Sequence, residues 1–426
     1  MVDTTPTAGL DEAALRWQGS DVLLGLLAEG ALAVGAGSPT DAGVAWTLPP
    51  VHPDPIELAG GIPDPATLPV NDLRDSFDRV LASTPTETLR YGGVQGFDGL
   101  RAVLAERQSR LEGIQLGPEN FLINNGGAGG ISTICDAVLN PSDVVIVEKP
   151  SFSGTLRTIR GHRPEIVPVP MDEHGVQVGR IAEAMERVEA AGKRVKLVYI
   201  IPDFHNPTGT TLTTERKAEL IRLCAEHQAL IIEDAAYAEI FFGTEAPASL
   251  YAMAGGQGVL KAATFSKVIA TGLRLGWVQG RADYINALIN VRFDMGNSPV
   301  LQRAVADYME SGKLDAHVKE MRPIYAQKCE TICRSLEEHC GPYVRFQRPA
   351  GGFFLWAECI GVSAQDVVRE AAKEGLIFPV GSLFFLDGER DDTEHIRLAF
   401  VTATLEQLEK VGPRLSRAFQ RALGER

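Results

Sequence analysis

Short apolar runs alternate with helical stretches between about residues 75 and 305, and this alternation restricts the possible folds more than any other feature of the chain. Residues 213–228 illustrate the helical stretches, because Leu220, Ile221, Cys224 and Ala225 fall on one face of a helix. We predict buried strands at residues 121–123, 144–147, 165–169, 196–201, 229–232, 259–265 and 273–278. The pattern predicts a three-layer α/β/α domain, with helices on both faces of a mostly parallel, seven-stranded sheet.

The C-terminal part of the 426-residue chain has a different, α+β pattern. We predict a long helix at 313–339, a strand pair at 344–346 and 353–356, a strand at 396–401 and a final helix. A chain of this length exceeds what one core usually holds, so we expect a large and a smaller domain. The expected division is a disordered tail at 1–12, an arm at 13–75 with a helix at 15–30 that contributes to the smaller domain, the large domain at 76–305 and the smaller domain at 306–426.

Charge and cysteine content exclude several classes of protein. The net charge is −14, from 41 basic and 55 acidic residues, which disfavours nucleic acid and anionic membranes as partners. No apolar run approaches the roughly 20 residues of a membrane span, and the acidic start predicts no signal peptide. Cys329 and Cys333 lie one helical turn apart, but no CxxC pair or spaced histidines accompany them. We therefore predict no metal site and expect a reducing, cytoplasmic setting.

Two connectors with turn-forming sequences follow predicted strands, at the sheet edge where open α/β sheets bind ligands. Residues 124–130 (NNGGAGG) follow the strand at 121–123 and open a helical stretch, so their backbone N–H groups can approach an anion closely. A glycine-rich connector without a ligand explains the same residues equally well. Residues 206–209 (NPTG) follow the strand at 196–201, and by themselves they indicate only a turn.

Reactive side chains follow two further strands. Asp234 ends the strand at 229–232, with Tyr237 three residues later, although an acid there also caps helices. Lys267 follows the strand at 259–265, with Arg274 seven residues later, and a lysine in this position is usually a surface charge. Each feature alone is ambiguous, so the order and the strand context carry the interpretation.

Taken together, these motifs resemble fold type I enzymes that use pyridoxal 5′-phosphate (PLP), in aminotransferase class I/II. The likeness is greatest to the kynurenine/2-aminoadipate aminotransferase group and covers roughly residues 55–420. The segments that carry it are 59–64 (AGGIPD), 91–92 (YG), 150–154 (PSFSG), 231–234 (IIED), 264–267 (TFSK), 272–276 (GLRLG) and 351–356 (GGFFLW).

The resemblance implies a role for each residue that touches the cofactor ring. Lys267 is expected to hold PLP as a Schiff base and then to act as the base at the substrate Cα. Asp234 is expected to face the pyridine nitrogen and keep it protonated. Asn206 and Tyr237 are expected to hydrogen-bond the phenolic oxygen, and Phe152 to stack on the ring.

The resemblance also implies phosphate, partner and substrate contacts. The phosphate ligands are expected to be the backbone of Gly127 and Ala128 together with Thr264, Ser266 and Arg274. Tyr91 is expected to reach the neighbouring subunit's cofactor, which implies a homodimer with shared sites. Arg397 is expected to clamp the substrate α-carboxylate, assisted by Asn206 and the backbone at Gly61.

The sequence is compatible with three functions. The leading hypothesis is an aminotransferase that moves the amino group of an L-amino acid to a 2-oxo acid, with 2-oxoglutarate as the favoured acceptor. The second is a PLP enzyme with another outcome: lyase, racemase, decarboxylase or oxidase. The third is a non-catalytic PLP-binding regulatory module. Only about 55 residues precede the fold, which we expect to be too few for a DNA-binding domain and linker, and this stretch is acidic. The residues do not identify the amino acid substrate, because the N-terminal 55 residues do not match the arm that often touches substrate in relatives. Relatives also commonly differ at Gly127, Ala128 and Phe152, which affects the expected contacts to the phosphate and the ring.

Overall fold

The computed structural model describes residues 25–34, 52–386, 392 and 394–424. The tail expected at residues 1–12, and the part of the expected helix 15–30 that precedes residue 25, lie outside the described residues. In the described part of the arm, helix α3 (Glu29–Val34) lies against α8 (Ser153–Gly161).

The main sheet has eight strands, in the order β2-β9-β8-β7-β6-β3-β4-β5. Their bounds are β2 Phe121–Asn124, β3 Val144–Lys149, β4 Glu165–Asp172, β5 Gly175–Val176, β6 Val195–Ile200, β7 Leu230–Asp234, β8 Val259–Thr264 and β9 Gly276–Gln279. Strands β8, β7, β6, β3 and β4 run parallel, whereas β9 is antiparallel to both β8 and β2. All seven predicted strands are present. The predicted number was one too low, because the two-residue β5 is too short to produce a periodic pattern.

Helices cover both faces of this sheet, as predicted. Side chains alternate along each strand, so Val145 and Val147 of β3 pack toward one face while Val144 and Ile146 pack toward the other. The first face is covered by α7 (Gly126–Val138), α8 and α12 (Ala282–Ile289), and the second by α9 (Val178–Ala190), α10 (Thr214–Glu226) and α11 (Leu250–Met253). This is the predicted α/β/α sandwich.

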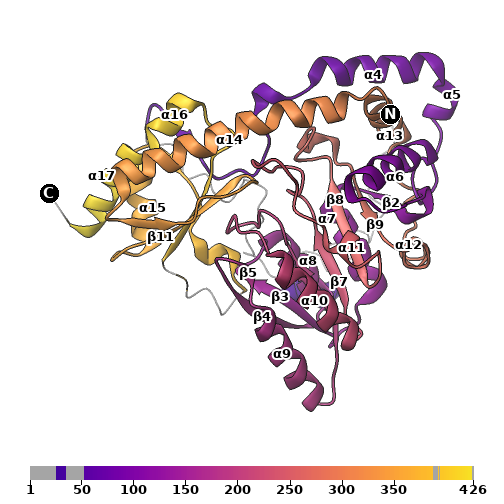
Figure 1. The fold of residues 1–426 in the computed structure, drawn as a ribbon, viewed down its shortest axis with the longest axis horizontal. Coiled ribbons are helices and arrows are strands. Elements are labelled where there is room, and N and C mark those ends of the chain that lie inside the picture. Colours follow the sequence, from indigo (N-terminus) through magenta and orange to yellow (C-terminus); the bar gives the residue numbers. More distant parts are fainter. Residues whose placement is uncertain (1–24, 35–51, 387–391, 393, 425–426) are drawn as a thin grey trace, which may run out of the picture.

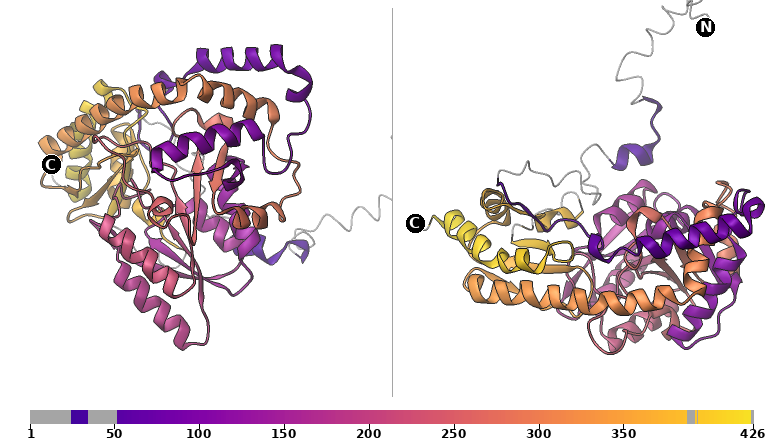
Figure 2. Two further views of the ribbon diagram at one scale, coloured as in Figure 1. Left: turned by 45° about the vertical axis from the view of Figure 1, so that its right-hand side comes forward. Right: turned by 90° about the horizontal axis from the view of Figure 1, so that it is seen from above.

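The smaller domain is built on a three-stranded antiparallel sheet (Figure 1). Its elements are β10 Val344–Phe346, β11 Phe354–Cys359, β13 His395–Ala399, α15 Ala364–Lys373, α16 Leu405–Glu409 and α17 Val411–Leu423. The long helix α14 (Lys313–Cys340) runs from this domain across toward the large one, and Figure 2 shows the same course from above. Strand β1 (Ile56–Glu57) pairs in parallel with β12 (Leu376–Ile377), which joins the start of the fold to its C-terminal part.

The other elements connect and cover these two sheets. They are α4 Val70–Ser83, α5 Pro85–Thr88, α6 Asp98–Glu112 and α13 Pro299–Glu310, with 3-10 turns η1 Pro65–Thr67, η2 Pro118–Asn120, η3 Thr271–Leu273 and η4 Gly381–Phe384. Helix α4 packs along α13, beside α14. Among helices of the described residues, none combines the length and apolar character needed to cross a membrane. In the same residues no three His, Cys, Asp or Glu side chains gather as a metal site.

Candidate active site

Asp234 is a buried carboxylate at the end of the parallel strand β7, only 7% exposed. The two-residue alternation places it on the face covered by α7 and α8, with Tyr199 of β6, while Glu233 points to the opposite face. The Tyr199 hydroxyl donates to Asp234 Oδ2 at 2.7 Å, and the Ala236 N–H donates to Oδ1 at 3.2 Å. Burial raises the pKa of Asp234, and these two hydrogen bonds and the charge of Lys267 oppose that rise.

Lys267 lies in the turn that follows β8, beside β7 in the sheet. Its Nζ donates to the Gly61 carbonyl oxygen at 2.6 Å and lies 5.5 Å from the centroid of the Tyr237 ring. Phe353 and Phe354 each pack edge-on against that ring, with centroids 5.4 Å away. The lysine and the buried carboxylate are therefore brought together at one edge of the sheet, as the sequence predicts.

Arg397 of β13 is fully buried and approaches the same site from the smaller domain. Its Nη1 donates to Asn206 Oδ1 at 2.8 Å, and Nη2 donates to the Ala59 carbonyl oxygen at 2.6 Å. The guanidinium carbon lies 4.3 Å from the Phe354 ring centroid and 4.6 Å from that of Phe384. Hydrogen bonds and aromatic faces together hold the planar cation in one orientation.

The glycine-rich connector forms an anion cradle at the N-terminus of the 13-residue helix α7. A Cβ placed on Gly127 would lie 3.6 Å from Thr264 Cβ, and one on Gly126 would lie 3.0 Å from an Arg274 nitrogen. The Thr264 hydroxyl donates to Ser266 Oγ at 2.9 Å, beside the same helix end. Backbone N–H groups, two hydroxyls and a guanidinium therefore converge where a helix N-terminus favours negative charge.

Gly276 of β9 packs against the backbone at the start of α7. A Cβ there would lie 2.5 Å from the Ala263 carbonyl oxygen and 2.8 Å from the Gly127 backbone nitrogen, so only glycine allows the approach. Ala128, the third residue of α7, is exposed and offers its backbone N–H but no side-chain donor.

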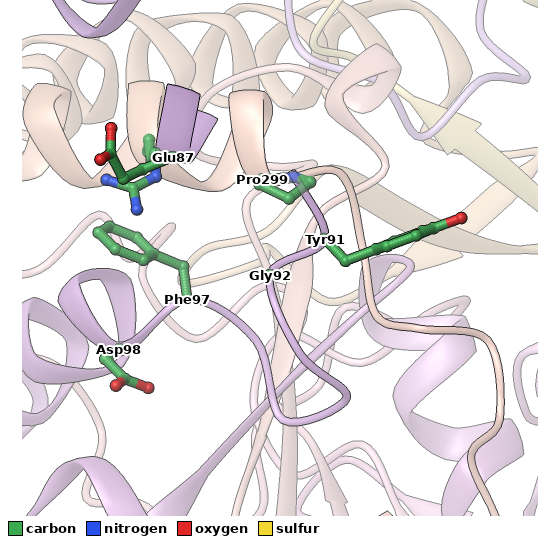
Figure 3. A pocket seen from close by; sticks show the side chains of 7 residues that line it. Glu87, Tyr91, Gly92, Phe97, Asp98 and Pro299 are labelled. Atoms are coloured by element: carbon green, nitrogen blue, oxygen red, sulfur yellow. The ribbon is translucent and has the colours of Figure 1, made fainter. Parts of the chain in front are cut away.

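Two predicted cofactor contacts have different surroundings. Phe152 is half-buried at the N-terminus of α8 and packs against the same core face as Tyr199. Tyr91 is not gathered into the buried group, since 81% of it is exposed. It borders a cavity of about 250 Å³, and Figure 3 shows its side chain beside Pro299 and directed away from Phe97.

Sequence reasoning missed several groups that complete the site. In the sequence, Tyr199 is one residue of an apolar strand, where a tyrosine gives no separate signal. Phe354 and Phe384 flank Arg397 from segments far apart in the chain, and the Ala59 carbonyl is a backbone group that no residue type reveals.

The donor set fits PLP. A phosphate dianion matches the α7 cradle and Arg274. A protonated ring nitrogen matches the Asp234 carboxylate, which loses solvation through its burial and would gain a directly bonded cation. Lys267 supplies the amine that this cofactor requires, and it donates to a carbonyl two residues away from the one that accepts from Arg397.

Comparisons with known proteins agree with this geometry. A family model for aminotransferase class I and II matches residues 53–415. The chain is 30% identical over 366 residues to aromatic-amino-acid aminotransferase 1 of Thermococcus litoralis, which covers 85% of this chain and 87% of that relative. It also matches the kynurenine aminotransferase of Pyrococcus horikoshii, solved in complex with PMP, with a TM-score of 0.82, 26% identity and coverage of 98% of this chain and 99% of that one.

A transcription regulator is also among the relatives. The chain is 30% identical over 359 residues to the uncharacterized HTH-type transcriptional regulator YisV of Bacillus subtilis, covering 84% of this chain but 72% of the regulator. The enzyme relatives are matched over nearly their whole length, so the comparisons favour the enzyme. The chain therefore belongs to the aminotransferase class I and II family and is a PLP-dependent aminotransferase.

Proposed function

We propose that this aminotransferase transfers the amino group of an L-amino acid to 2-oxoglutarate, with Arg397 binding the α-carboxylate and Lys267 acting at Cα. One observation carries the proposal: the Ala59 carbonyl accepts from Arg397 and the Gly61 carbonyl accepts from Lys267. The carboxylate-binding fork and the base are thus held two residues apart on one short segment. That spacing suits an α-amino acid, whose carboxylate and reacting hydrogen share one carbon.

The cofactor is assigned to the residues that the sequence motifs single out. When PLP is bound, Lys267 would hold it as a Schiff base, Asp234 would accept the hydrogen bond of its ring nitrogen, Asn206 and Tyr237 would contact its phenolic oxygen, and Phe152 would stack on the ring. The phosphate would be bound by Gly127, Ala128, Thr264, Ser266 and Arg274. The convergence of Thr264 and Arg274 on the start of α7 supports the phosphate assignment.

Bound PLP supplies the electron sink for the electrons of the broken Cα–H bond. Lys267 takes the Cα proton through its amine, and the Arg397 fork orients the carboxylate so that this hydrogen faces the lysine. Asp234 keeps a proton on the ring nitrogen through its buried, hydrogen-bonded carboxylate. One water would hydrolyse the substrate's C=N bond, so that the 2-oxo acid leaves while the bound cofactor keeps the amino group. The second oxo acid would take up this amino group in the reverse sequence, which returns the water.

The test is a panel of L-amino acids with 2-oxoglutarate, followed through the visible absorbance of the bound cofactor. Lys267→Ala is expected to abolish turnover and covalent attachment. Arg397→Ala is expected to raise KM for every α-amino acid, whereas Arg414→Ala, which removes another buried arginine bonded to Asp54, should leave KM unchanged. Release of ammonia, or continued release of an oxo acid beyond one equivalent per site without any acceptor, would contradict amino-group transfer to an acceptor.

We also propose a homodimer in which Tyr91 reaches the partner's cofactor. Tyr91 and Phe293 are 81% and 94% exposed. They stand on loops that touch, since a Cβ on Gly296 would lie 2.1 Å from the Gly93 carbonyl oxygen. If sites are shared, mixing inactive Lys267→Ala and Tyr91→Ala subunits restores about a quarter of the activity, because only hybrids have one intact site. No recovery after subunit exchange would refute sharing.

The division into domains and the location are proposed on similar grounds. The pairing of β1 with β12 supports an arm at 13–75 that contributes to the smaller domain, with the large domain at 76–305 and the smaller at 306–426. Six buried, free cysteines support a reducing, cytoplasmic location. Fractionation with a thiol-accessibility assay tests the location.

A further inference from the structure

Residues 59–64 form a short irregular segment, called here the strap, which crosses the active site. Its Ala59 carbonyl accepts from Arg397 at 2.6 Å, and its Gly61 carbonyl accepts from Lys267 at 2.6 Å. Both of these contacts use backbone oxygens of the strap. The position of the strap therefore helps to determine where the two cations lie.

The strap is pressed closely onto aromatic rings. A Cβ on Gly61 would lie 2.6 Å from a Phe354 ring carbon and 3.3 Å from the Tyr237 hydroxyl oxygen. Tyr237 in turn packs edge-on against Phe353, and Phe353 packs against Tyr325 with ring centroids 5.3 Å apart. Close packing of this kind transmits a displacement of the strap ends to its centre, because no free space absorbs it.

The two ends of the strap are fixed by different means. At the N-terminal end, backbone hydrogen bonds join Leu58 to Ile377 at 2.8 Å and to Ala399 at 2.7 Å. At the C-terminal end, the Asp64 N–H donates to Tyr325 Oη at 3.2 Å. Both ends are thus attached to the smaller domain, whereas Lys267 belongs to the large sheet.

A buried ion pair completes the C-terminal attachment. Lys328 of α14 donates to Asp64 Oδ2 at 2.5 Å and to the Val401 carbonyl oxygen at 2.6 Å. The second oxygen of Asp64 accepts from the Ala66 N–H at 3.0 Å, so its carboxylate is fixed in direction. The two residues are 5% and 9% exposed. A buried pair contributes little net stability relative to apolar residues of similar volume, so its directional geometry is the property that an apolar pair would not supply.

We propose that Asp64 and Lys328 are positioning residues for the transamination reaction, holding the strap so that its carbonyls orient Arg397 and Lys267. The pair touches neither substrate nor cofactor and acts only through the backbone of residues 59–61. This inference rests on the proposed roles of Arg397 and Lys267.

The experiment uses the holoenzyme and the probe 2-aminoisobutyrate, which carries the α-carboxylate and amine but has no Cα hydrogen to lose. Its Kd is measured from the visible absorbance, together with the pH midpoint of the resting absorbance, which reports on the surroundings of the lysine nitrogen. Lys328→Met is expected to weaken probe binding about tenfold and to shift the midpoint. Asp64→Asn, which keeps the side-chain length, should give the same two changes, and Lys328→Arg should restore most of the affinity.

A matched control separates positioning from general loss of stability. The Lys261–Glu112 pair has the same 2.5 Å separation, with side chains 8% and 6% exposed, and joins β8 to α6 without contacting the strap. Lys261→Met should lower thermal stability and leave the probe Kd and the midpoint unchanged. Equal effects of Lys261→Met and Lys328→Met, or no change in either readout for Lys328→Met and Asp64→Asn, would overturn the proposal.

The Arg397→Ala variant distinguishes failure of this inference from failure of the proposed site. If Arg397→Ala leaves the probe Kd unchanged, the carboxylate site is elsewhere and the inference falls with it. If Arg397→Ala weakens binding while Lys328→Met and Asp64→Asn do not, the site stands and only the positioning role is refuted.

Discussion

Removing the Tyr199 hydroxyl tests the electronic role assigned to Asp234. Tyr199 donates at 2.7 Å to the carboxylate, and this bond is the largest influence opposing the burial that raises the pKa of Asp234. Tyr199→Phe therefore raises that pKa further. A hydrogen bond to an ionised acceptor contributes about 1.5–3 kcal/mol, and each 1.4 kcal/mol is about tenfold in affinity. We expect PLP affinity to fall by roughly 10- to 100-fold, because a protonated Asp234 no longer pairs with a protonated ring nitrogen.

The same change has a defined pH signature in the apoprotein. The folded pKa of Asp234 is raised, so its contribution to stability is full in acid and is lost as pH rises through that pKa. Tyr199→Phe enlarges this loss, and the difference from the native chain should grow from acid to neutral pH. Urea unfolding and PLP titration measure the two effects.

Tyr308→Phe is the matched control for that experiment. Tyr308 lies in α13, is fully buried, and its hydroxyl has no hydrogen-bond partner among the described residues. Losing it should leave PLP affinity unchanged and stability equal or higher. If Tyr199→Phe binds PLP as tightly as Tyr308→Phe does, the assigned link between Tyr199, Asp234 and the cofactor is incorrect.

Three further substitutions give separate expectations. Gly276→Ala should weaken PLP binding by about tenfold or more in a titration, because its Cβ meets backbone atoms, whereas Gly272→Ala, with nothing within 4 Å, should not. Burial raises the pKa of Glu233 to about 7, so the free energy of unfolding falls as pH rises through that value. Glu233→Gln should therefore reduce the pH dependence of the unfolding free energy between about pH 4 and pH 8. An unchanged pH dependence would refute the raised pKa of Glu233. Gly61→Ala should raise KM for amino acids, since the added Cβ would lie 2.6 Å from a Phe354 ring carbon. An unaltered KM would show that the strap moves to accommodate the methyl group.

The sequence was sufficient to predict the large sheet and to single out several residues that the structure brings together. Buried parallel strands give uninterrupted apolar runs, and Asp234 and Lys267 come at or just beyond the ends of such runs, whereas Arg397 was singled out by a motif. The two-residue β5 could not be predicted because it has no periodicity.

Hydrogen-bond partners across strands were harder to predict. Tyr199 and Asp234 lie on adjacent strands, and only the register that aligns Ile200 with Glu233 brings them together. The strap posed the same difficulty, because its function depends on backbone oxygens and on a lysine far along the chain. The type of a residue does not indicate which distant residue it will pair with.

The pairing of β1 with β12 has a consequence for biosynthesis. As the chain leaves the ribosome, β1 must wait until residues 376–377 have been made before its partner exists, and Arg397 emerges later still. Strands β7 and β8, which position Asp234 and Lys267, are made well before that point. A nascent chain can thus assemble these parts of its cofactor pocket first and acquire the ability to hold an amino acid only after Arg397 has emerged.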